Sequence, residues 1–532
     1  MGRVIVVGWD GATWDLLMPL IERGVCPVLG QLAGESAYGP LRSTIPPVTA
    51  PSWITMATGV NPGRHGCFDF NKADGALSRI RPLQSWDIKA KTFYEVLEEQ
   101  KRPFVLVNLP GTYPPLTKGI TLTSLLTRGE NAVFPEELKE KSDVLKNYRI
   151  FPDSGLLRKG RASEYLLDIM DVEIRRFEAM KELWERDWDL FFTVFSGGDW
   201  VSHELFGELL EGTAPSEAEG VFRLMDEALA YVLRRMRPDD SLLMVSDHGF
   251  QRARGVVHLN EILRDRGLLS PDFSCPSPPP SHRMEEGSFA AGDFRKPPEW
   301  LLKRGMNSDL FRYAIKAFRK AGGSYPLFLR PDRRGSRASL FTSESYGITI
   351  HEKSMFSDGM VEPESVGELK ESITGELRKL IYDGEHVFRQ VLAREEVYSG
   401  EHAAEAPHVL IGDTDWALSS AIRTLEKDPF APCPRGIHSM NGIFLGYGRA
   451  FRKAEIPLND MKVEDITPAI LHLLGEPVPE GLDGSVPSRW FESDFAQRNP
   501  VRFRSYETPL REPGDVEGDE IQKRLKGLGY MS

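Results

Sequence analysis

The sequence predicts an α/β fold with a mostly parallel sheet, helices on both faces of that sheet, and an inserted α+β cap region. Residues 1–250 alternate short apolar runs with helical patterns, which is typical of a parallel, doubly wound sheet. The alternation breaks down around the proline-rich residues 276–280, which indicate a loop or linker. It returns at 440–475. The break and the return together indicate a core interrupted by an insertion.

The first half of the chain contains most of the expected core elements. Continuous apolar runs predict strands that are buried on both faces, at residues 4–7, 104–108, 190–195 and 242–245. Amphipathic spacing predicts helices at 13–23, 92–100 and 165–186, and a further helix marked by Phe222, Met225, Leu229 and Val232. Strands and helices therefore alternate through residue 250.

The second half is less regular. Residues 251–435 are interpreted as an insertion or cap, with a basic helical piece at 310–319, a strand at 346–351 and a helix near 366–382. A strand at 443–445 marks the return to the core, followed by a helix through Leu474 with Thr467 as N-cap and Pro468 as its first residue. We interpret 1–250 and 436–495 as a discontinuous core and 496–532 as a C-terminal tail, with a short helical piece near 521–528.

Composition restricts the classes of function. The chain has 532 residues, enough for two to four domains, and is 41% apolar and 27% charged, as expected for a globular protein. A net charge of −12 argues against a nucleic-acid partner, whose binding surface is normally basic. It is compatible with a small phosphate-bearing substrate, because bound metal ions invert the local field. Oligomeric state is not predicted.

Cysteines and apolar segments carry little signal. Cys26, Cys67, Cys275 and Cys433 are widely spaced, which argues against a disulfide framework or a thiolate metal site. The first expected strand begins by Val4, which leaves no room for a signal peptide. No stretch approaches the ~18 apolar residues that cross a bilayer. We therefore expect a cytoplasmic protein without a transmembrane segment.

Acidic and histidine residues accompany the expected strands. Ligands of open α/β sheets bind outside the carboxyl ends of the strands. Each such residue alone is more often a cap, an ion pair or a core histidine, but six together are hard to explain in that way. Three Asp and three His are enough ligands for two divalent cations, which predicts a two-metal hydrolytic site. The six are Asp10, Asp199, His203, Asp247, His248 and His438.

Thr49 is the candidate nucleophile. It lies between Pro46-Pro47 and a helical pattern in which Pro51 suits the first turn. A hydroxyl there faces a helix N-terminus, which favours a phosphate. The competing interpretation is that Thr49 is only an N-cap. Ser52, Thr44 and Thr55 are rival hydroxyls.

Two nearby residues are expected to be structural or solvated. His65 lies in the glycine-bounded segment 62–66, whose composition is that of a turn. Arg64 is expected to be an ordinary solvated side chain, with phosphate binding as the alternative. Neither is therefore a predicted catalytic residue.

These motifs resemble the type I phosphodiesterase/nucleotide pyrophosphatase family of the alkaline phosphatase superfamily. The resemblance covers about 1–250 and 435–490, and residues 251–435 have no counterpart. It rests on Asp10 in Val-Val-Gly-x-Asp-Gly, Thr49-x-Pro51, Thr58-Gly59, Pro62-x-x-His65-Gly66, Asp199 with His203, Ser246-Asp247-His248-Gly249, Gly436-Ile437-His438, and 464–468 through Gly475 with Asp483-Gly484.

The resemblance implies an alkaline-phosphatase-like fold with two metal ions. One ion would be held by Asp199, His203 and His438, and the other by Asp10, Asp247, His248 and the Thr49 oxygen. Zinc is the expected metal and manganese the alternative. Thr49 would attack phosphorus and form a covalent phosphoryl-threonine, with the ions lowering the pKa of its hydroxyl, stabilising the leaving oxygen and activating water.

One position departs from the family pattern. The nucleotide pyrophosphatases carry an Asn shortly after His-Gly that holds a phosphate oxygen. Phe70 occupies the aligned position here and Asn71 follows it. Asn71 is therefore a candidate substrate-binding residue, and nucleotide specificity stays open.

The resulting prediction is a metal-dependent phosphohydrolase that cleaves phosphodiester or pyrophosphate bonds in a small phosphate ester. Alternatives in the same superfamily are a phosphomonoesterase, a phosphonate hydrolase or a phosphoglycerate-mutase-like phosphotransferase. The mutase is disfavoured because its nucleophile is normally Ser. A sulfatase is disfavoured because no Cys-x-Pro-x-Arg signature is present. An idle scaffold on the same fold is the alternative from another class, and the complete ligand set argues against it.

Overall fold

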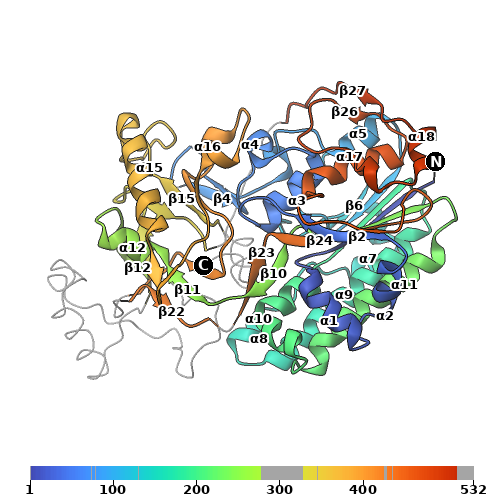
Figure 1. The fold of residues 1–532 in the computed structure, drawn as a ribbon, viewed down its shortest axis with the longest axis horizontal. Coiled ribbons are helices and arrows are strands. Elements are labelled where there is room, and N and C mark those ends of the chain that lie inside the picture. The colour runs from blue at the N-terminus through green and yellow to red at the C-terminus, as the bar shows by residue number, and fades with distance from the viewer. Residues whose placement is uncertain are drawn as a thin grey trace.

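A nine-stranded mixed sheet forms the centre of the molecule (Figure 1). The computed structural model describes residues 2–276 and 328–511, except 74, 78, 130, 344, 424–427 and 434. The strand order is β25-β2-β24-β9-β1-β8-β5-β6-β7. The strands are β1 Val4–Trp9, β2 Ala37–Arg42, β5 Phe104–Val107, β6 Ile120–Leu122, β7 Val133–Phe134, β8 Leu190–Phe195, β9 Ser241–Val245, β24 Asn441–Tyr447 and β25 Ala454–Glu455.

The middle of this sheet is parallel. Strands β9, β1, β8, β5 and β6 all run in one direction. Strand β24 lies antiparallel between β9 and β2, and β7 is antiparallel to β6. The mostly parallel sheet is confirmed, and each of the five strands expected from the apolar runs is present.

Both faces of the sheet are buried. Along β1, Ile5 and Val7 belong to one hydrophobic cluster, whereas Val4 and Val6 belong to the other. Successive side chains of a strand point to opposite faces, so a strand buried on both sides must be apolar at every position. The continuous apolar run in the sequence follows from this requirement.

Helices cover the two faces, as predicted (Figure 1). The cluster that contains Ile5 is built with α1 Trp14–Glu22, α2 Pro27–Ala33, α9 Ala162–Trp184, α10 Gly197–Glu211 and α11 Ser216–Arg235. The cluster that contains Val4 is built with residues of α3 Thr49–Thr58, α5 Phe93–Glu99 and α17 Ile466–Leu473.

The starts of two helices follow the sequence, and that of a third does not. Thr13 is the N-cap of α1, and Thr92 forms a capping box with Glu95 in α5. The prediction that Thr467 caps α17 was wrong: the N-cap is Asp465, because a 3₁₀ turn at Val463–Asp465 runs directly into the helix. The Thr467 hydroxyl instead donates to the Met56 carbonyl of α3, at 2.7 Å.

The described residues between 251 and 435 build small sheets beside the core (Figure 1). Their boundaries as a separate cap stay an interpretation. The main elements are β11 Gly255–His258, α12 Leu259–Asp265, β12 Ser270–Pro276, β13 Phe328–Asp332, β14 Ala338–Leu340, β15 Gly347–Ile350, α15 Pro363–Arg378, β18 Val391–Ala393, β19 Val409–Ile411, β20 Trp416–Ser419, β21 Ile422–Arg423 and β22 Phe430–Ala431.

The helix expected near 366–382 is present but begins and ends earlier than predicted, at Pro363 and Arg378. It ends at Arg378, and Tyr382 belongs to a small hairpin, β16 Ile381–Tyr382 with β17 Glu385–His386. The reason is the dipeptide Asp383-Gly384, both at positive φ, which is a typical two-residue hairpin turn. The helical pieces expected at 310–319 and 521–528 lie outside the described residues.

Short elements complete the described chain. They include α4 Pro62–His65, β3 Asn71–Ala73, β4 Ile80–Pro82, α6 Glu137–Glu140, α7 Asp143–Lys146, α8 Gly155–Arg158, β10 Gly249–Arg252, α16 Arg394–Val397, β23 Gly436–Ser439, β26 Val478–Pro479, α18 Ser493–Arg498 and β27 Phe503–Arg504.

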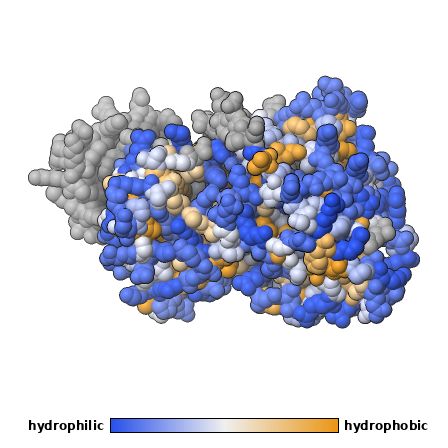
Figure 2. All heavy atoms as spheres, turned by 90° about the horizontal axis from the view of Figure 1, so that it is seen from above, coloured by the Kyte–Doolittle hydropathy of each residue, from blue (hydrophilic) through white to orange (hydrophobic). Residues whose placement is uncertain are grey.

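Within the described ranges no single helix is long and apolar enough to cross a bilayer. Helices α1 and α2 reach that length and apolar composition only together, and the chain bends by 114° between them. On the face in Figure 2, hydrophobic residues occur in small groups among hydrophilic ones. The cytoplasmic location stays a prediction from the sequence.

Candidate metal centre

Five segments that are distant in sequence meet at the carboxyl edge of the sheet. Strands β1, β8 and β9 are paired in parallel register up to Trp9, Phe195 and Val245. Asp10, the start of α10 and Asp247 therefore leave the sheet at the same edge. Strand β24 is antiparallel to β9, so its first residues lie there too, and β2 ends beside them before the chain turns into α3. This is the edge at which ligands of open α/β sheets bind.

The first triad consists of Asp199, His203 and His438. Asp199 and His203 lie one turn apart on α10, as expected, and His438 lies on β23, which pairs with β10. Asp199 Oδ1 is 3.5 Å from His203 Nε2 and 3.4 Å from His438 Nε2, and the two Nε2 atoms are 3.1 Å apart. A tetrahedral zinc ion with bonds of about 2.0–2.1 Å separates its ligand atoms by about 3.3–3.4 Å. The triad therefore has the spacing of one face of such a site.

The second triad consists of Asp10, Asp247 and His248. His248 Nε2 lies 3.2 Å from Asp247 Oδ2 and 3.8 Å from Asp10 Oδ1. The Thr49 hydroxyl oxygen lies 3.0 Å from the same Nε2. Adjacent residues such as Asp247 and His248 reach one site because they stand in the loop between β9 and β10 rather than on a strand.

Backbone carbonyls fix the tautomers of two imidazoles. His438 Nδ1 is 3.0 Å from the carbonyl of Pro47, and His248 Nδ1 is 3.1 Å from that of Gly249. Because a carbonyl only accepts hydrogen bonds, each Nδ1 carries the proton and donates it. Each Nε2 is then left with a lone pair directed at its triad, which is the arrangement found in metal-binding histidines.

The two triads lie side by side. The rings of His248 and His438 stack with centroids 3.6 Å apart and an interplanar angle of 20°. Gly11, which follows Asp10, has φ +67°, and a Cβ built on it would lie 3.2 Å from Asp199 Oδ1 and 2.5 Å from Phe250 Cε2. Glycine is therefore required here both by backbone conformation and by space.

The buried carboxylates of the site would be stabilised by a bound positive charge. The three carboxylates are completely buried, and neither oxygen of Asp10 accepts a hydrogen bond from an N–H or O–H group of the described residues. Burial, and then the Asp247 charge, raise the pKa of Asp10 well above its usual value. Burial and the Asp199 charge raise the pKa of Asp247 to about 7. Buried, mutually repelling carboxylates beside imidazoles fit divalent cations.

The imidazoles are held in the form that binds metals. Burial lowers the pKa of His203 to about 3 and the pKa of His248 well below its usual value. Burial opposes ionisation of Asp199 as well, but its interactions with His203 and the other two imidazoles leave its pKa below the usual range. Neutral histidines and ionised carboxylates are the protonation states that coordinate zinc or manganese.

Thr49 is the hydroxyl that faces the triads. It is the first residue of α3, and the N-cap is Val48, so the interpretation of Thr49 as a cap was wrong. Thr44 donates to the Pro46 carbonyl at 2.8 Å, so Ser52 must donate to Thr44, 2.7 Å away. Thr55 is bonded to His65 Nε2 at 2.8 Å. The three rival hydroxyls thus have other partners, whereas Thr49 meets His248.

Other candidates have structural contacts. His65 accepts a hydrogen bond from the Cys67 N–H at Nδ1, 3.2 Å away, in addition to its bond to Thr55, as expected for a structural residue. Arg64 donates to Asp483 at 3.2 Å and to the Gly481 carbonyl, which ties α4 to the C-terminal part of the core. Asn71 begins β3 and is not part of either triad, but its amide nitrogen and oxygen are buried and have no hydrogen-bond partner in the part of the chain that the structure describes.

Two supporting residues were missed in the sequence. Ser246 accepts from the Ala12 N–H at 3.0 Å and donates to the His248 carbonyl at 2.5 Å, which joins the loops after β1 and β9. The buried Phe250 ring lies with its centroid 4.9 Å from that of His203 and 5.1 Å from that of His438. Phe250 follows His248 by two residues on β10, and this proximity was the available signal.

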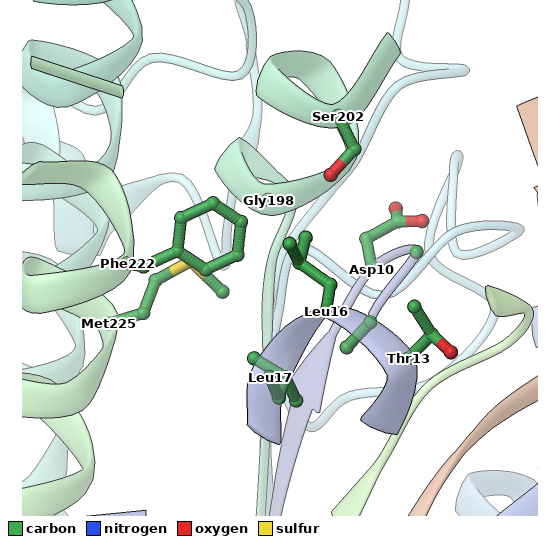
Figure 3. Close-up of a pocket in the computed structure, with 10 residues that line it drawn as sticks. Asp10, Thr13, Leu16, Leu17, Gly198, Ser202, Phe222 and Met225 are labelled. Atoms are coloured by element: carbon green, nitrogen blue, oxygen red, sulfur yellow. The ribbon is translucent and has the colours of Figure 1, made fainter. Parts of the chain in front are cut away.

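A pocket adjoins the second triad (Figure 3). The Asp10 carboxylate and the Ser202 hydroxyl lie on one side of it, and apolar side chains, among them Phe222 and Met225, line the other. The apolar side chains come from α1 and α11 and give this carboxylate surroundings of low polarity, consistent with the raised pKa of Asp10.

Comparison with known families identifies the chain. The family model described as type I phosphodiesterase/nucleotide pyrophosphatase matches residues 4–299, more than half of the sequence. The chain belongs to this family. It is thus a phosphoric ester hydrolase of the phosphodiesterase/pyrophosphatase type. A search of curated proteins gives no match.

Solved structures with the same fold agree with this assignment. Murine ectonucleotide pyrophosphatase/phosphodiesterase 5 is 15% identical, with a TM-score of 0.51, over 92% of this chain and 100% of that chain. Phosphonoacetate hydrolase from Sinorhizobium meliloti 1021 is 14% identical, with a TM-score of 0.51, over 88% and 94%. The chain therefore shares its fold with these two proteins, and the predicted alkaline-phosphatase-like α/β fold is confirmed.

Proposed function

We propose that this family member is a two-metal hydrolase of small phosphodiesters or pyrophosphates that uses Thr49 as its nucleophile. The observation that carries the proposal is the position of the Thr49 hydroxyl, 3.0 Å from His248 Nε2 at the N-terminus of α3. The same Nε2 atom lies 3.2 Å from Asp247 Oδ2 and 3.8 Å from Asp10 Oδ1, the two acidic ligands of the second triad. The rival hydroxyls are engaged elsewhere.

The metal-binding residues follow from the two triads. Asp199, His203 and His438 would hold one ion; Asp10, Asp247, His248 and the Thr49 oxygen would hold the other. Nitrogen and carboxylate ligands at tetrahedral spacing favour zinc, with manganese as the alternative. When bound, the ions supply the positive charge that lowers the pKa of a hydroxyl and stabilises charge developing at phosphorus.

The chain itself positions the reacting groups. Thr49 Oγ1 attacks phosphorus as its hydroxyl proton is lost to solvent, and the P–O bond to the leaving alcohol or phosphate breaks. The phosphoryl group, which still carries the substrate's other ester substituent, stays on Thr49 until water hydrolyses the bond between Oγ1 and phosphorus. The first N–H groups of α3 have no partners within the helix, and with its dipole they favour the phosphoryl oxygens. Asn71, whose buried amide has no partner, is proposed to donate to a non-bridging oxygen.

The organic part of the substrate is proposed to contact residues 251–435, which we treat as a cap on the core formed by 1–250 and 436–495. The murine structure has been solved in complex with AMP, and the Sinorhizobium hydrolase in complex with phosphonoacetate. Phosphonate hydrolysis is therefore the second candidate reaction, ahead of monoester hydrolysis or phosphotransfer.

The test compares three substrates with three proteins. Wild type, Thr49→Ala and the control Ser52→Ala are assayed on bis-p-nitrophenyl phosphate, p-nitrophenyl phosphate and phosphonoacetate, with zinc or manganese present. We expect wild type and Ser52→Ala to prefer the diester, and Thr49→Ala to be inactive on all three. Intact-protein mass spectrometry of a quenched reaction with the diester should show a chain that carries a p-nitrophenyl phosphoryl group, which Thr49→Ala lacks. Equal rates for wild type and Thr49→Ala exclude Thr49 as the nucleophile.

A further inference from the structure

A buried ion pair lies against the start of the helix that carries Asp199 and His203. Glu173 and Arg176, both on α9, are 0% exposed. Glu173 Oε1 accepts hydrogen bonds from the N–H groups of Ser196, at 3.0 Å, and Gly197, at 2.7 Å, and is paired with the Arg176 guanidinium. Glu173 therefore supplies an acceptor to N–H groups that a helix start leaves unsatisfied.

This cap comes from another helix. The N-cap residue of α10 is Ser196, whose side chain makes no capping hydrogen bond. A Cβ on Gly197 would lie 2.9 Å from Glu173 Cγ and 2.7 Å from Val221 Cγ1. Glycine at 197 thus allows the carboxylate to approach the backbone closely. The local sequence of α10 is adapted to an acceptor provided by α9.

Arg176 contacts the same helix at a second point. Its guanidinium carbon lies 5.8 Å from the centroid of the Trp200 ring, and it donates to the Ile150 carbonyl at 3.3 Å. Trp200 follows Asp199 directly. The ion pair therefore contacts α10 on both sides of Asp199 along the chain.

Stability alone is a weak reason for such a pair. Removing two charges from water costs several kcal/mol per ion, and well-packed apolar residues are often as stabilising as a buried ion pair. What an apolar pair lacks is an acceptor for the first N–H groups of α10. The feature that distinguishes Glu173 is therefore the control it exerts on the start of this helix.

We propose that Glu173 is a positioning residue for the triad Asp199–His203–His438, and that Arg176 holds its carboxylate in place. The inference rests on the proposed two-metal function. Without the acceptor, the first turn of α10 loses the anchor that keeps Asp199 and His203 directed at His438. Residues that orient metal ligands contribute roughly 10- to 100-fold to metal affinity. The triad Asp10–Asp247–His248 is not held by α10 and keeps its affinity.

The test separates the acceptor from the charges. Glu173→Gln/Arg176→Met keeps an acceptor oxygen, whereas Glu173→Met/Arg176→Met removes it; both lack the ion pair. Zinc is titrated into each metal-free protein by isothermal calorimetry. The titration is repeated with Asp247→Asn added to each variant, and again with Asp199→Asn added, so that only one intact triad binds zinc. We expect the Met/Met variant to bind one of its two zinc ions about 10- to 100-fold more weakly than wild type does. The loss should appear in the Asp247→Asn background, which leaves only the triad of Asp199, and not in the Asp199→Asn background. The Gln/Met variant should bind both ions like wild type.

Controls keep the inference falsifiable. Gly197→Ala displaces the Glu173 carboxylate while retaining both charges, and we expect it to lower the affinity for the same zinc ion. This variant provides the test if the Met/Met variant does not fold. Glu261→Gln breaks another buried pair, with Arg423, and should lower Tm while leaving zinc binding unchanged. Equal zinc affinities of the Gln/Met and Met/Met variants, or normal affinity of Gly197→Ala, overturn the role of Glu173. Wild type that binds no zinc or manganese overturns the proposed function instead.

Discussion

The two triads at the carboxyl edge of the sheet differ in charge. The triad Asp199–His203–His438 has one carboxylate and two imidazoles, and its carboxylate keeps a pKa below the usual range. The triad Asp10–Asp247–His248 has two carboxylates and one imidazole, and burial together with neighbouring negative charge raises the pKa of both carboxyls. With neutral imidazoles, the first triad carries one negative charge, and the second carries two when both of its carboxyls are ionised.

This difference in charge indicates which triad acts on the nucleophile. The more acidic triad lies beside the Thr49 hydroxyl, where a cation has the most negative charge to neutralise and a proton to displace. The triads also differ in their support. One is built on α10 and β23, and the other on the loops that follow β1 and β9.

The largest expected effect is on catalysis. Asp247→Asn and Asp199→Asn should each reduce kcat by about 10³-fold, since a catalytic metal ion contributes several kcal/mol to the transition state. Each variant should retain about one metal ion per chain by elemental analysis, because the other triad is intact. The matched control is Asp226→Asn, a carboxylate that accepts from the Val28 and Leu29 N–H groups. It should lower Tm and leave kcat near wild type. Full activity in either triad variant contradicts a two-metal mechanism.

The next effect concerns the glycine between the triads. Gly11→Ala should reduce kcat about 10- to 100-fold, because its Cβ would displace Asp199 Oδ1 and Phe250. Gly24 has nearly the same φ, +72°, but nothing lies within 4 Å of its Cβ position. Gly24→Ala should therefore lower Tm through backbone strain and keep kcat. If both variants lose activity equally, backbone strain rather than crowding of the triads is the cause.

A smaller effect appears in the metal-free protein. The pKa of Asp247 is about 7 in the fold against a usual 3.8, so its protonated form stabilises the fold at low pH and this stability is lost as pH rises from about 4 to 7. In chelator, Asp247→Asn should therefore have a higher Tm than wild type at pH 8, with the difference closing toward pH 4. Asp199→Asn should have a lower Tm at pH 8, because the ionised form of this residue stabilises the fold. Thermal unfolding at pH 5 and 8 checks both, and a lower Tm for Asp247→Asn at pH 8 refutes the charge imbalance.

The smallest effect separates the hydroxyls. Ser52→Ala removes one member of the hydroxyl chain Ser43–Ser52–Thr44 and should destabilise the fold by about 1 kcal/mol. Its kcat should stay near that of wild type, measured beside Thr49→Ala. If Ser52→Ala loses activity as completely as Thr49→Ala, the hydrogen-bonded hydroxyls of Ser43, Ser52 and Thr44 are also required for the nucleophilic step.

The core could be predicted from local patterns because burial determines which residue types each short segment contains. The strand β1 is apolar at every position because both faces are covered, and α5 begins at a Thr92–Glu95 capping box. Predictions failed where neighbouring structure changed the outcome. Thr467-Pro468 has the sequence of a helix start, but a 3₁₀ turn already brings the chain into helical geometry at Asp465.

The sequence by itself determined the types of ligand, their order and their places after the apolar strands. Those features follow from chemistry and periodicity that each short segment carries alone. The tertiary structure decided which atoms meet: Asp199 with His438, Thr49 rather than Ser52 with His248, and Glu173 with the start of α10. The residues in these contacts are far apart in sequence, from 23 positions for Glu173 and Ser196 to 239 positions for Asp199 and His438. They meet because strand order and register bring their segments together, which no short segment specifies alone.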